Sequence, residues 1–219
     1  RNHTLPTTIA IGFALFVVAT VHTVQRNVLD QMAVDARPDR PNFVLFDVQR
    51  DQVAGVEALL EQHGAGVTDR APLISARLSG VHGIARSEFL ADEGLSRELR
   101  WALQREYRLT YSDVLRESEE IIAGAWWEPD SVSADAERFP VSLERDLAKS
   151  LSVGVGDAVT FRIQGVDVET EVASIRQVDW GRMATNFFVV FPPAGLEDAP
   201  QSTVLLAHLA EEEARSAMQ

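Results

Sequence analysis

Cysteine is absent from the 219 residues of this chain. Its absence excludes disulfide bonds, thiolate catalysis and zinc sites that use cysteine ligands, and it is compatible with an oxidising compartment. Positive charge is also scarce: Lys149 is the single lysine, and 20 basic residues stand against 33 acidic ones, for a formal net charge of −13. A chain of this charge has no basic stripe to replace phosphate counterions, so we expect no nucleic-acid partner.

Sequence motifs for catalysis and nucleotide binding are missing as well. No G-x-x-x-x-G-K-[ST] sequence occurs, so ATP would have to be bound by another chain. The segment 154–157 follows a helical pattern and precedes a strand, the reverse of a phosphate-binding loop; we expect a turn in which the Asp157 side chain bonds backbone NH groups. The five histidines lack metal-ligand spacing and no G-x-S-x-G turn occurs, so we expect no catalytic residue, metal or cofactor. Two alternatives stay open, a triad of distant residues and a spatial cluster of His63, His82 and His208.

The N-terminal segment is the longest apolar stretch. Leu5 to Val24 contains no Asp, Glu, Lys or Arg, and about twenty such residues suffice to cross a hydrocarbon core. We predict a transmembrane helix that continues to about Met32 and ends before the Arg-Pro-Asp-Arg-Pro linker. A cleaved signal peptide, which would need a basic leader and a small-residue cleavage site, and a buried core helix are the alternatives. The chain opens at Arg1 without a Met and ends in a helical pattern from Ala210, so we expect a segment of a longer protein.

The rest of the sequence alternates strand and helix signals. A strand at 42–48, a helix from Gln52 to His63 and a strand from Leu73 to Val81 make one βαβ unit. A right-handed crossover leaves a gap between its two strands, and we expect the strand 203–209 to fill it, antiparallel to both. Further strands are predicted at 108–116, 158–164, 168–178 and 187–191, and helices at 96–105 and at 143–151, the latter capped by Ser142.

Trp126 and Trp127 stand out among the side chains. Adjacent indoles ahead of an acidic loop could dock a partner or an acyl chain, because large aromatic side chains dominate interface energetics. On a strand, neighbouring side chains point to opposite faces. At least one of the two is therefore expected in the core, and the pair is the candidate contact for a partner or substrate.

Several stretches of the chain, in this order and spacing, resemble the extracytoplasmic domain of FtsX/MacB-type ABC transporter permeases, in particular the YbbP-like branch. The stretches are Arg-Pro-Asn-Phe-Val-Leu-Phe-Asp-Val after the apolar helix, Pro-Leu-Ile-Ser-Ala-Arg-Leu, and the segments 141–157, 174–180 and 186–192.

The resemblance implies an α+β fold in which one transmembrane helix precedes a split βαβ sheet, Porter-like and ferredoxin-like, with an inserted β-rich, Sabre-like subdomain. The corresponding boundaries are 1–36 for the transmembrane helix and its extracytoplasmic extension, 42–83 for the first half of the Porter-like part, 84–202 for the insertion and 203–219 for the start of the second half.

The resemblance also implies a function. The chain would be the periplasmic or extracytoplasmic part of a permease in the inner (plasma) membrane, coupling ATP-driven motion to export or extraction of a lipid or hydrophobic envelope substrate. ATP would be hydrolysed by a separate cytoplasmic ABC ATPase subunit, so this chain would not be an enzyme, and an envelope protein is a further expected partner. A membrane-anchored envelope hydrolase or binding module is the alternative, and it would need convergent polar groups in a pocket. An adhesion or scaffold domain is a third class.

Overall fold

The structure is a computed structural model, and it describes residues 4–35, 41–181 and 184–209. The chain divides into two compact units, Arg1–Arg40 and Pro41–Gln219. The helix expected from Ala210 and most of the expected linker lie outside the described residues.

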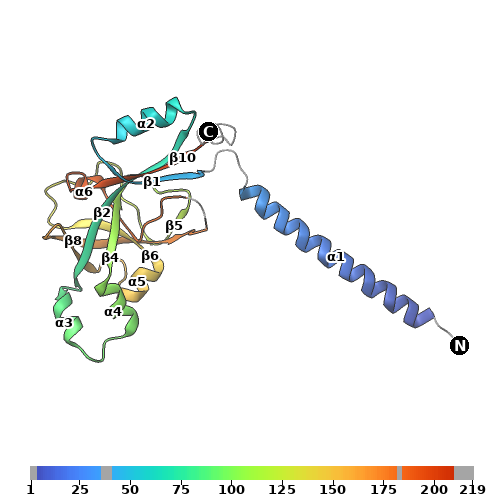
Figure 1. Ribbon diagram of the computed structural model, residues 1–219. Helices are drawn as coiled ribbons and strands as arrows, with labels where there is room; N and C mark the ends of the chain where they lie inside the picture. The colour runs from blue at the N-terminus through green and yellow to red at the C-terminus, as the bar shows by residue number, and fades with distance from the viewer. Residues whose placement is uncertain (1–3, 36–40, 182–183, 210–219) are drawn as a thin grey trace. The chain divides into compact units, whose positions relative to one another are not determined.

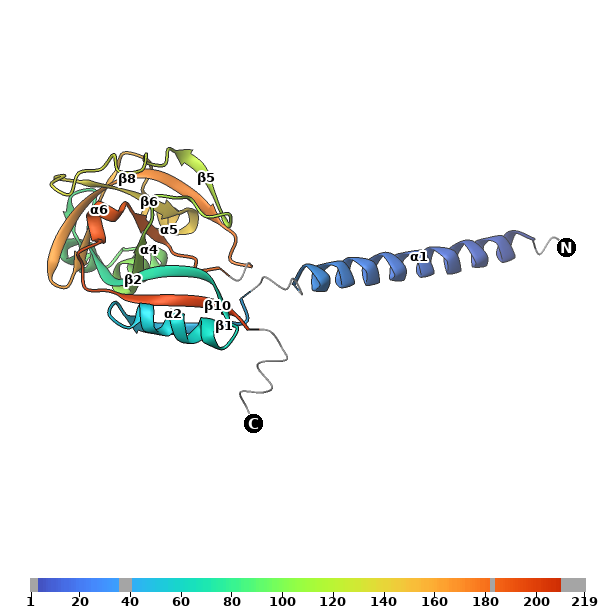
Figure 2. The same ribbon diagram turned by 90° about the horizontal axis from the view of Figure 1, so that it is seen from above.

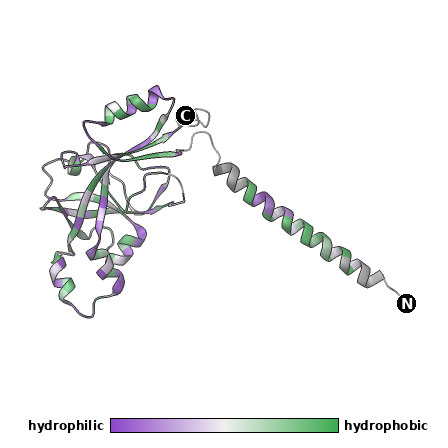
Figure 3. Ribbon diagram, in the orientation of Figure 1, coloured by the Kyte–Doolittle hydropathy of each residue, from purple (hydrophilic) through white to green (hydrophobic). Residues whose placement is uncertain are grey.

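The first unit consists of helix α1, Thr4–Asp35. Its 32 residues correspond to a length of about 48 Å at 1.5 Å per residue, and apolar residues cover its middle (Figure 3). The stretch Ile11–Leu29 is long and apolar enough to cross a membrane, and none of it is buried against other parts of the chain. Thr20 and Thr23 donate their hydroxyls to carbonyls one turn back, which leaves no free hydroxyl donor on either side chain. The expected helix is confirmed.

The second unit begins with a small sheet of β1 (Phe43–Gln49), β10 (Ser202–His208) and the first half of β2 (Gly66–Val81). Strand β10 lies in the centre and pairs antiparallel with both neighbours, as expected for the returning strand. The expected start of the second strand at Leu73 was wrong, because β10 pairs with 66–73. Polar residues at 68–70 obscured the strand pattern, although Thr68 donates to the Leu206 carbonyl and Asp69 is bonded to Arg116.

Helix α2 (Val53–Gln62) connects β1 to β2 and lies along this sheet (Figure 1, Figure 2). Strand β1 is at the end of the strand order, so its outer edge has no strand partner among the described residues. An open edge of this kind can template further strand pairing.

Six strands of the second unit close into a ring. Strand β2 pairs with β4 (Glu106–Tyr111), which pairs with β9 (Val189–Phe191), and β9 with β6 (Phe139–Glu144). Strand β6 pairs with β8 (Val166–Val178), β8 with β7 (Ala158–Ile163), and β7 returns to β2. Closure removes the free edges of these strands. Because β2 reaches from the small sheet into the ring, one continuous strand joins the two.

The main hydrophobic core joins the ring strands to three helices, α4 (Arg97–Gln104), α5 (Arg145–Leu151) and α6 (Pro193–Leu196). Each large apolar side chain buried there stabilises the fold by about 1.5–3 kcal/mol. Strand β5 (Glu119–Gly124) pairs with β8 outside the ring, β3 (Ile84–Ala85) forms a hairpin with β2, and α3 (Arg86–Ala91) follows β3. Core side chains include Leu78, Leu109, Leu143, Phe161, Val172 and Val189.

The helix start expected at Ser142 was wrong. Ser142 lies fully buried in β6, a strand that the sequence did not reveal. Helix α5 begins at Arg145, and the Glu144 side chain caps it by accepting from the NH groups of Asp146 and Leu147, both at 3.0 Å. A carboxylate at this position is favoured by the free NH groups and the dipole of the helix start.

Candidate functional site

Trp126 and Trp127 lie just beyond the end of β5, not on a strand. Gly124 ends the strand at φ 73°, where an added Cβ would lie 2.1 Å from the Ala173 carbonyl oxygen. Only glycine therefore fits here, and the chain turns so that the two indoles stack on each other, with ring centroids 4.1 Å apart. The expectation that they point to opposite faces was wrong, because β5 ends two residues before Trp126.

Both indoles are anchored to the loop that follows β4. Trp126 donates its NH to the Asp113 carbonyl at 2.9 Å, and Trp127 donates to the Ser112 carbonyl at 3.1 Å. Trp127 is 8% exposed and belongs to a small core cluster with Ala71, while Trp126 is half-buried beside it. Trp127 is thus a core residue, and only Trp126 retains a surface for contact.

An acidic hollow of about 310 Å³ lies near Trp126. Four carboxylates line it, and burial together with the charges of Asp130 and Glu197 raises the pKa of Asp113 above its ordinary value. Its acidic residues are Asp113, Glu128, Asp130 and Glu197. They do not form a group suited to a metal ion, and no such group of three or more His, Cys, Asp or Glu occurs in the described part of the chain.

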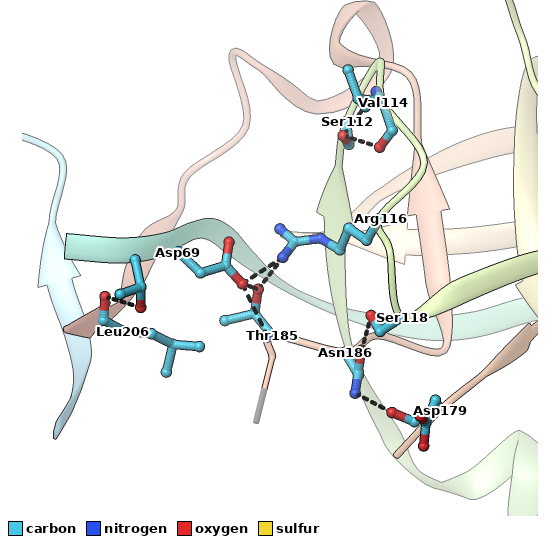
Figure 4. Close-up of polar contacts among 10 residues, drawn as sticks. Asp69, Ser112, Val114, Arg116, Ser118, Asp179, Thr185, Asn186 and Leu206 are labelled. Atoms are coloured by element: carbon cyan, nitrogen blue, oxygen red, sulfur yellow. Dashed lines mark hydrogen bonds and ion pairs between the residues drawn. The ribbon is translucent and has the colours of Figure 1, made fainter. Parts of the chain in front are cut away.

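Asp69 of β2 ties the small sheet to two loops (Figure 4). Its Oδ2 accepts from Arg116 at 2.6 Å and from the Thr185 backbone NH at 3.1 Å, and the Thr185 hydroxyl bonds the same oxygen. Burial alone would raise the pKa of Asp69, but the hydrogen bonds from Thr185 and the charge of Arg116 outweigh it and lower that pKa. Because Asp69 already accepts hydrogen bonds from Arg116 and Thr185, its role is to hold the two loops against β2 and not to catalyse a reaction.

Arg176 is the most deeply buried cation among the described residues. Its side chain and that of Glu119 are 0% and 1% exposed, and Nε donates to Glu119 Oε1 at 3.0 Å. The guanidinium also donates to the carbonyls of Ser142, at 2.7 Å, and Phe187. Burial lowers the pKa of Arg176, which Glu119 opposes. With its donors paired to a carboxylate and two carbonyls, Arg176 acts as a structural clamp between β8, β6, β5 and the loop before β9.

His82 and Asp157 contact each other and the backbone around residues 152–154. His82 Nε2 lies 3.2 Å from the Ser152 carbonyl oxygen and Nδ1 lies 3.6 Å from Asp157 Oδ1. Asp157 Oδ2 accepts from the Gly154 NH at 2.7 Å, which confirms the expected turn. The described residues bring no third ligand to His82, and the possible cluster with His63 and His208 is not formed.

A larger, mostly apolar hollow of about 460 Å³ lies between the small sheet and the loop 184–188. Its floor is made by apolar side chains of β1, β10 and β2, and its lining includes no residue of α2. Phe46, 71% exposed, and Trp180, 50% exposed, stand at its rim. The sequence did not predict this hollow, because its walls come from segments far apart in the chain. The floor consists of Val44, Leu73, Val204 and Leu206.

Arg105 also lines this hollow. Its guanidinium carbon lies 4.4 Å from the Trp101 ring centroid, 4.9 Å from that of Tyr107 and 4.6 Å from that of Phe188. Three ring faces thus hold the cation. Across the described residues no carboxylate lies within ion-pair distance of Arg105. The adjacent Arg108, in contrast, pairs with Glu106 at 3.5 Å.

Comparison with known proteins gives one sequence relative. The chain is 31% identical over 193 residues to YbbP, an uncharacterized ABC transporter permease of Escherichia coli strain K12. The chain is similar to part of an ABC transporter permease. The match covers 88% of this chain but 22% of the length of that permease, so the chain corresponds to about a fifth of it. No protein-family model matches.

One solved structure is a crystallised domain assigned to a permease protein of Porphyromonas gingivalis. The superposition covers 82% of this chain and 81% of that domain, at 13% identity and a TM-score of 0.38. At this TM-score the likeness carries no argument about the fold.

Proposed function

We propose that this chain is the extracytoplasmic part of an ABC transporter permease in the inner (plasma) membrane. The observation that carries the proposal is the 31% identity to a permease over 88% of the chain. Helix α1, with its apolar stretch Ile11–Leu29, supports it, because a permease must be anchored in the membrane. The globular unit would lie outside the cytoplasm, where a cysteine-free, acidic domain is chemically suited to remain soluble.

The role would be mechanical, not catalytic. ATP would be hydrolysed by a separate cytoplasmic ABC ATPase subunit, whose closure moves α1 and with it the extracytoplasmic unit. The work done would be the export or extraction of a lipid or another hydrophobic envelope substrate. The closed ring of six strands supports this role, since a ring without free edges transmits force as a unit.

The subdivision of the globular unit is part of the proposal. Residues 42–83 and 203–219 would form the Porter-like part, which includes the small sheet, and 84–202 the Sabre-like insertion, which includes most of the ring; residues 1–36 would be the transmembrane helix and its extension. Support comes from the central position of β10 between β1 and β2, the strand order expected of a split βαβ sheet.

A partner surface is proposed at Trp126. This half-buried indole adjoins the acidic hollow of Asp113, Glu128, Asp130 and Glu197, so an envelope protein that contacts it would present a basic side chain beside an apolar one. Trp127 would support the contact from below through its stacked ring, 4.1 Å away.

The proposal is tested with the full-length permease and its ATPase reconstituted in liposomes. ATP-dependent extraction of a fluorescent phospholipid should occur with the wild type and fail when residues 41–209 are deleted. Trp126→Ala should reduce export or partner capture while leaving the fold intact, and Val166→Ala, which truncates an exposed apolar side chain elsewhere, is the control. Equal extraction with and without the domain would overturn the proposal in favour of an envelope binding module.

A further inference from the structure

We propose that the hollow between the small sheet and the loop 184–188 binds the acyl chain of an anionic amphiphile, whose carboxylate pairs with Arg105. The inference rests on the proposed function in one respect, that the domain handles a hydrophobic envelope substrate. It adds a site, a ligand class and a residue that selects the headgroup.

The walls of the hollow fit a single alkyl chain. A volume of about 460 Å³ is within the range of small-molecule sites, and the floor is aliphatic along β1, β10 and β2. Two aromatic side chains, Phe46 and Trp180, stand exposed at the rim. Each methylene that leaves water for such a surface favours binding, and exposed aromatic side chains beside an aliphatic floor are costly unless something covers them.

The charged side chains that line the hollow favour an anion. Among the lining residues that the structure describes, Arg105 and Arg108 are the two cations and Glu106 is the one carboxylate. Glu106 is engaged by Arg108 at 3.5 Å and by Arg77 at 3.7 Å. The described residues place three aromatic rings around Arg105 but no carboxylate within ion-pair distance. Its guanidinium NH groups can therefore donate to a bound carboxylate.

The position of Arg105 links headgroup and chain. Phe188, one of the three rings that hold the cation, also lines the hollow and lies 4.9 Å from the ring of Trp180. A carboxylate at Arg105 would therefore direct its chain past Phe188 onto the aliphatic floor. A guanidinium held on ring faces loses little freedom when it binds a carboxylate, which favours this pairing.

The experiment uses the full chain in phosphatidylcholine nanodiscs with two photoactivatable probes. One is a palmitic acid that carries a diazirine in the middle of its chain, and the other is the corresponding alcohol. Adducts are mapped by mass spectrometry. The acid should label peptides that contain 184–188 and 204–206, and more strongly than the alcohol.

Three variants separate headgroup from chain. Arg105→Gln should lower labelling of these peptides by the acid about tenfold, the loss expected for one charge-assisted hydrogen bond, and change labelling by the alcohol less than twofold. Phe46→Ser, at an exposed position, should lower labelling by both probes. Arg97→Gln, which removes an exposed arginine from another surface, should leave both unchanged.

Two outcomes would overturn the inference. One is labelling confined to α1 or to other surfaces, and the other is equal labelling by acid and alcohol that Arg105→Gln does not alter. Lipid extraction by the full-length permease is a separate measurement. If the permease extracts lipid but the hollow is not labelled, the acyl-chain site is refuted and the proposed function stands. If the hollow is labelled but the complete transporter extracts no lipid, the site stands and the proposed function is refuted.

Discussion

Replacement of Arg176 by methionine should destabilise the globular unit more than the replacement of any exposed arginine. Methionine fills similar space but leaves the Glu119 carboxylate, 1% exposed, without its cation. It also leaves the carbonyls of Ser142 and Phe187 without their guanidinium donor. Removing one partner of such a buried pair costs about 3–5 kcal/mol. With a urea dependence of about 2 kcal/mol per molar, the unfolding midpoint should fall by about 2 M.

Tryptophan fluorescence gives a readout that is specific for this unit. All four tryptophans of the chain lie beyond residue 100, so α1 in its detergent micelle contributes no signal. The matched control is Arg162→Met, because Arg162 also lies on a ring strand and pairs with Asp167 at 2.6 Å, but its side chain is 55% exposed. Solvent screens an ion pair as exposed as this one, so it adds little to stability and this variant should unfold close to the wild type.

The double variant Arg176→Met with Glu119→Met completes the test. Because it buries no unpaired charge, it should be more stable than Arg176→Met alone. Two results would refute a stabilising role for the buried pair. One is the same unfolding midpoint for Arg176→Met and Arg162→Met. The other is a double variant whose loss of stability equals the sum of the losses of Arg176→Met and Glu119→Met.

Four further substitutions can be tested by urea unfolding. Trp127→Ala should cost about 3–5 kcal/mol as a core truncation and Trp126→Ala clearly less; equal losses would show that both indoles are core residues and would end the proposal for Trp126. Asp69→Asn should lower stability by about 1–2 kcal/mol near pH 6. The folded-state pKa of Asp69 lies below its ordinary value of 3.8. Its contribution to stability is therefore present above pH 3.8 and lost as the pH falls through the folded-state pKa. The difference in stability between wild type and variant should therefore shrink as the pH falls below 3.8, and not widen. Glu144→Ala should cost about 1 kcal/mol through the lost cap of α5, and no change would mean that the cap is dispensable.

Local patterns in the sequence were sufficient for the elements that depend on neighbouring residues. The apolar helix, the unit of β1 and α2, and the turn at Asp157 were predicted from composition, periodicity and turn chemistry. The central place of β10 followed from the handedness of the crossover.

Features that depend on distant segments were not predictable in this way. The ring closes through the parallel pairs of β6 with β8 and of β4 with β9, which join residues far apart in the chain. Strand β6 also carries Pro140, a residue that is disfavoured inside sheets, and its buried Ser142 looked like a helix cap. The stacking of the two tryptophans depends on the positive φ of Gly124 and on its close approach to Ala173, which lies some fifty residues further along the chain.

The apolar hollow was missed for the same reason. Its residues come from five separate stretches of the chain.

The side of the membrane on which the globular unit lies tests the central claim most directly. Because the chain has no cysteine, a single introduced cysteine reports its own location without background. Glu93→Cys lies at an exposed position of the globular unit, and Asn2→Cys precedes α1. In spheroplasts of a bacterial expression host, a membrane-impermeant maleimide should label Glu93→Cys before lysis and Asn2→Cys only afterwards. Labelling of Glu93→Cys only after lysis would put the unit in the cytoplasm and contradict the account.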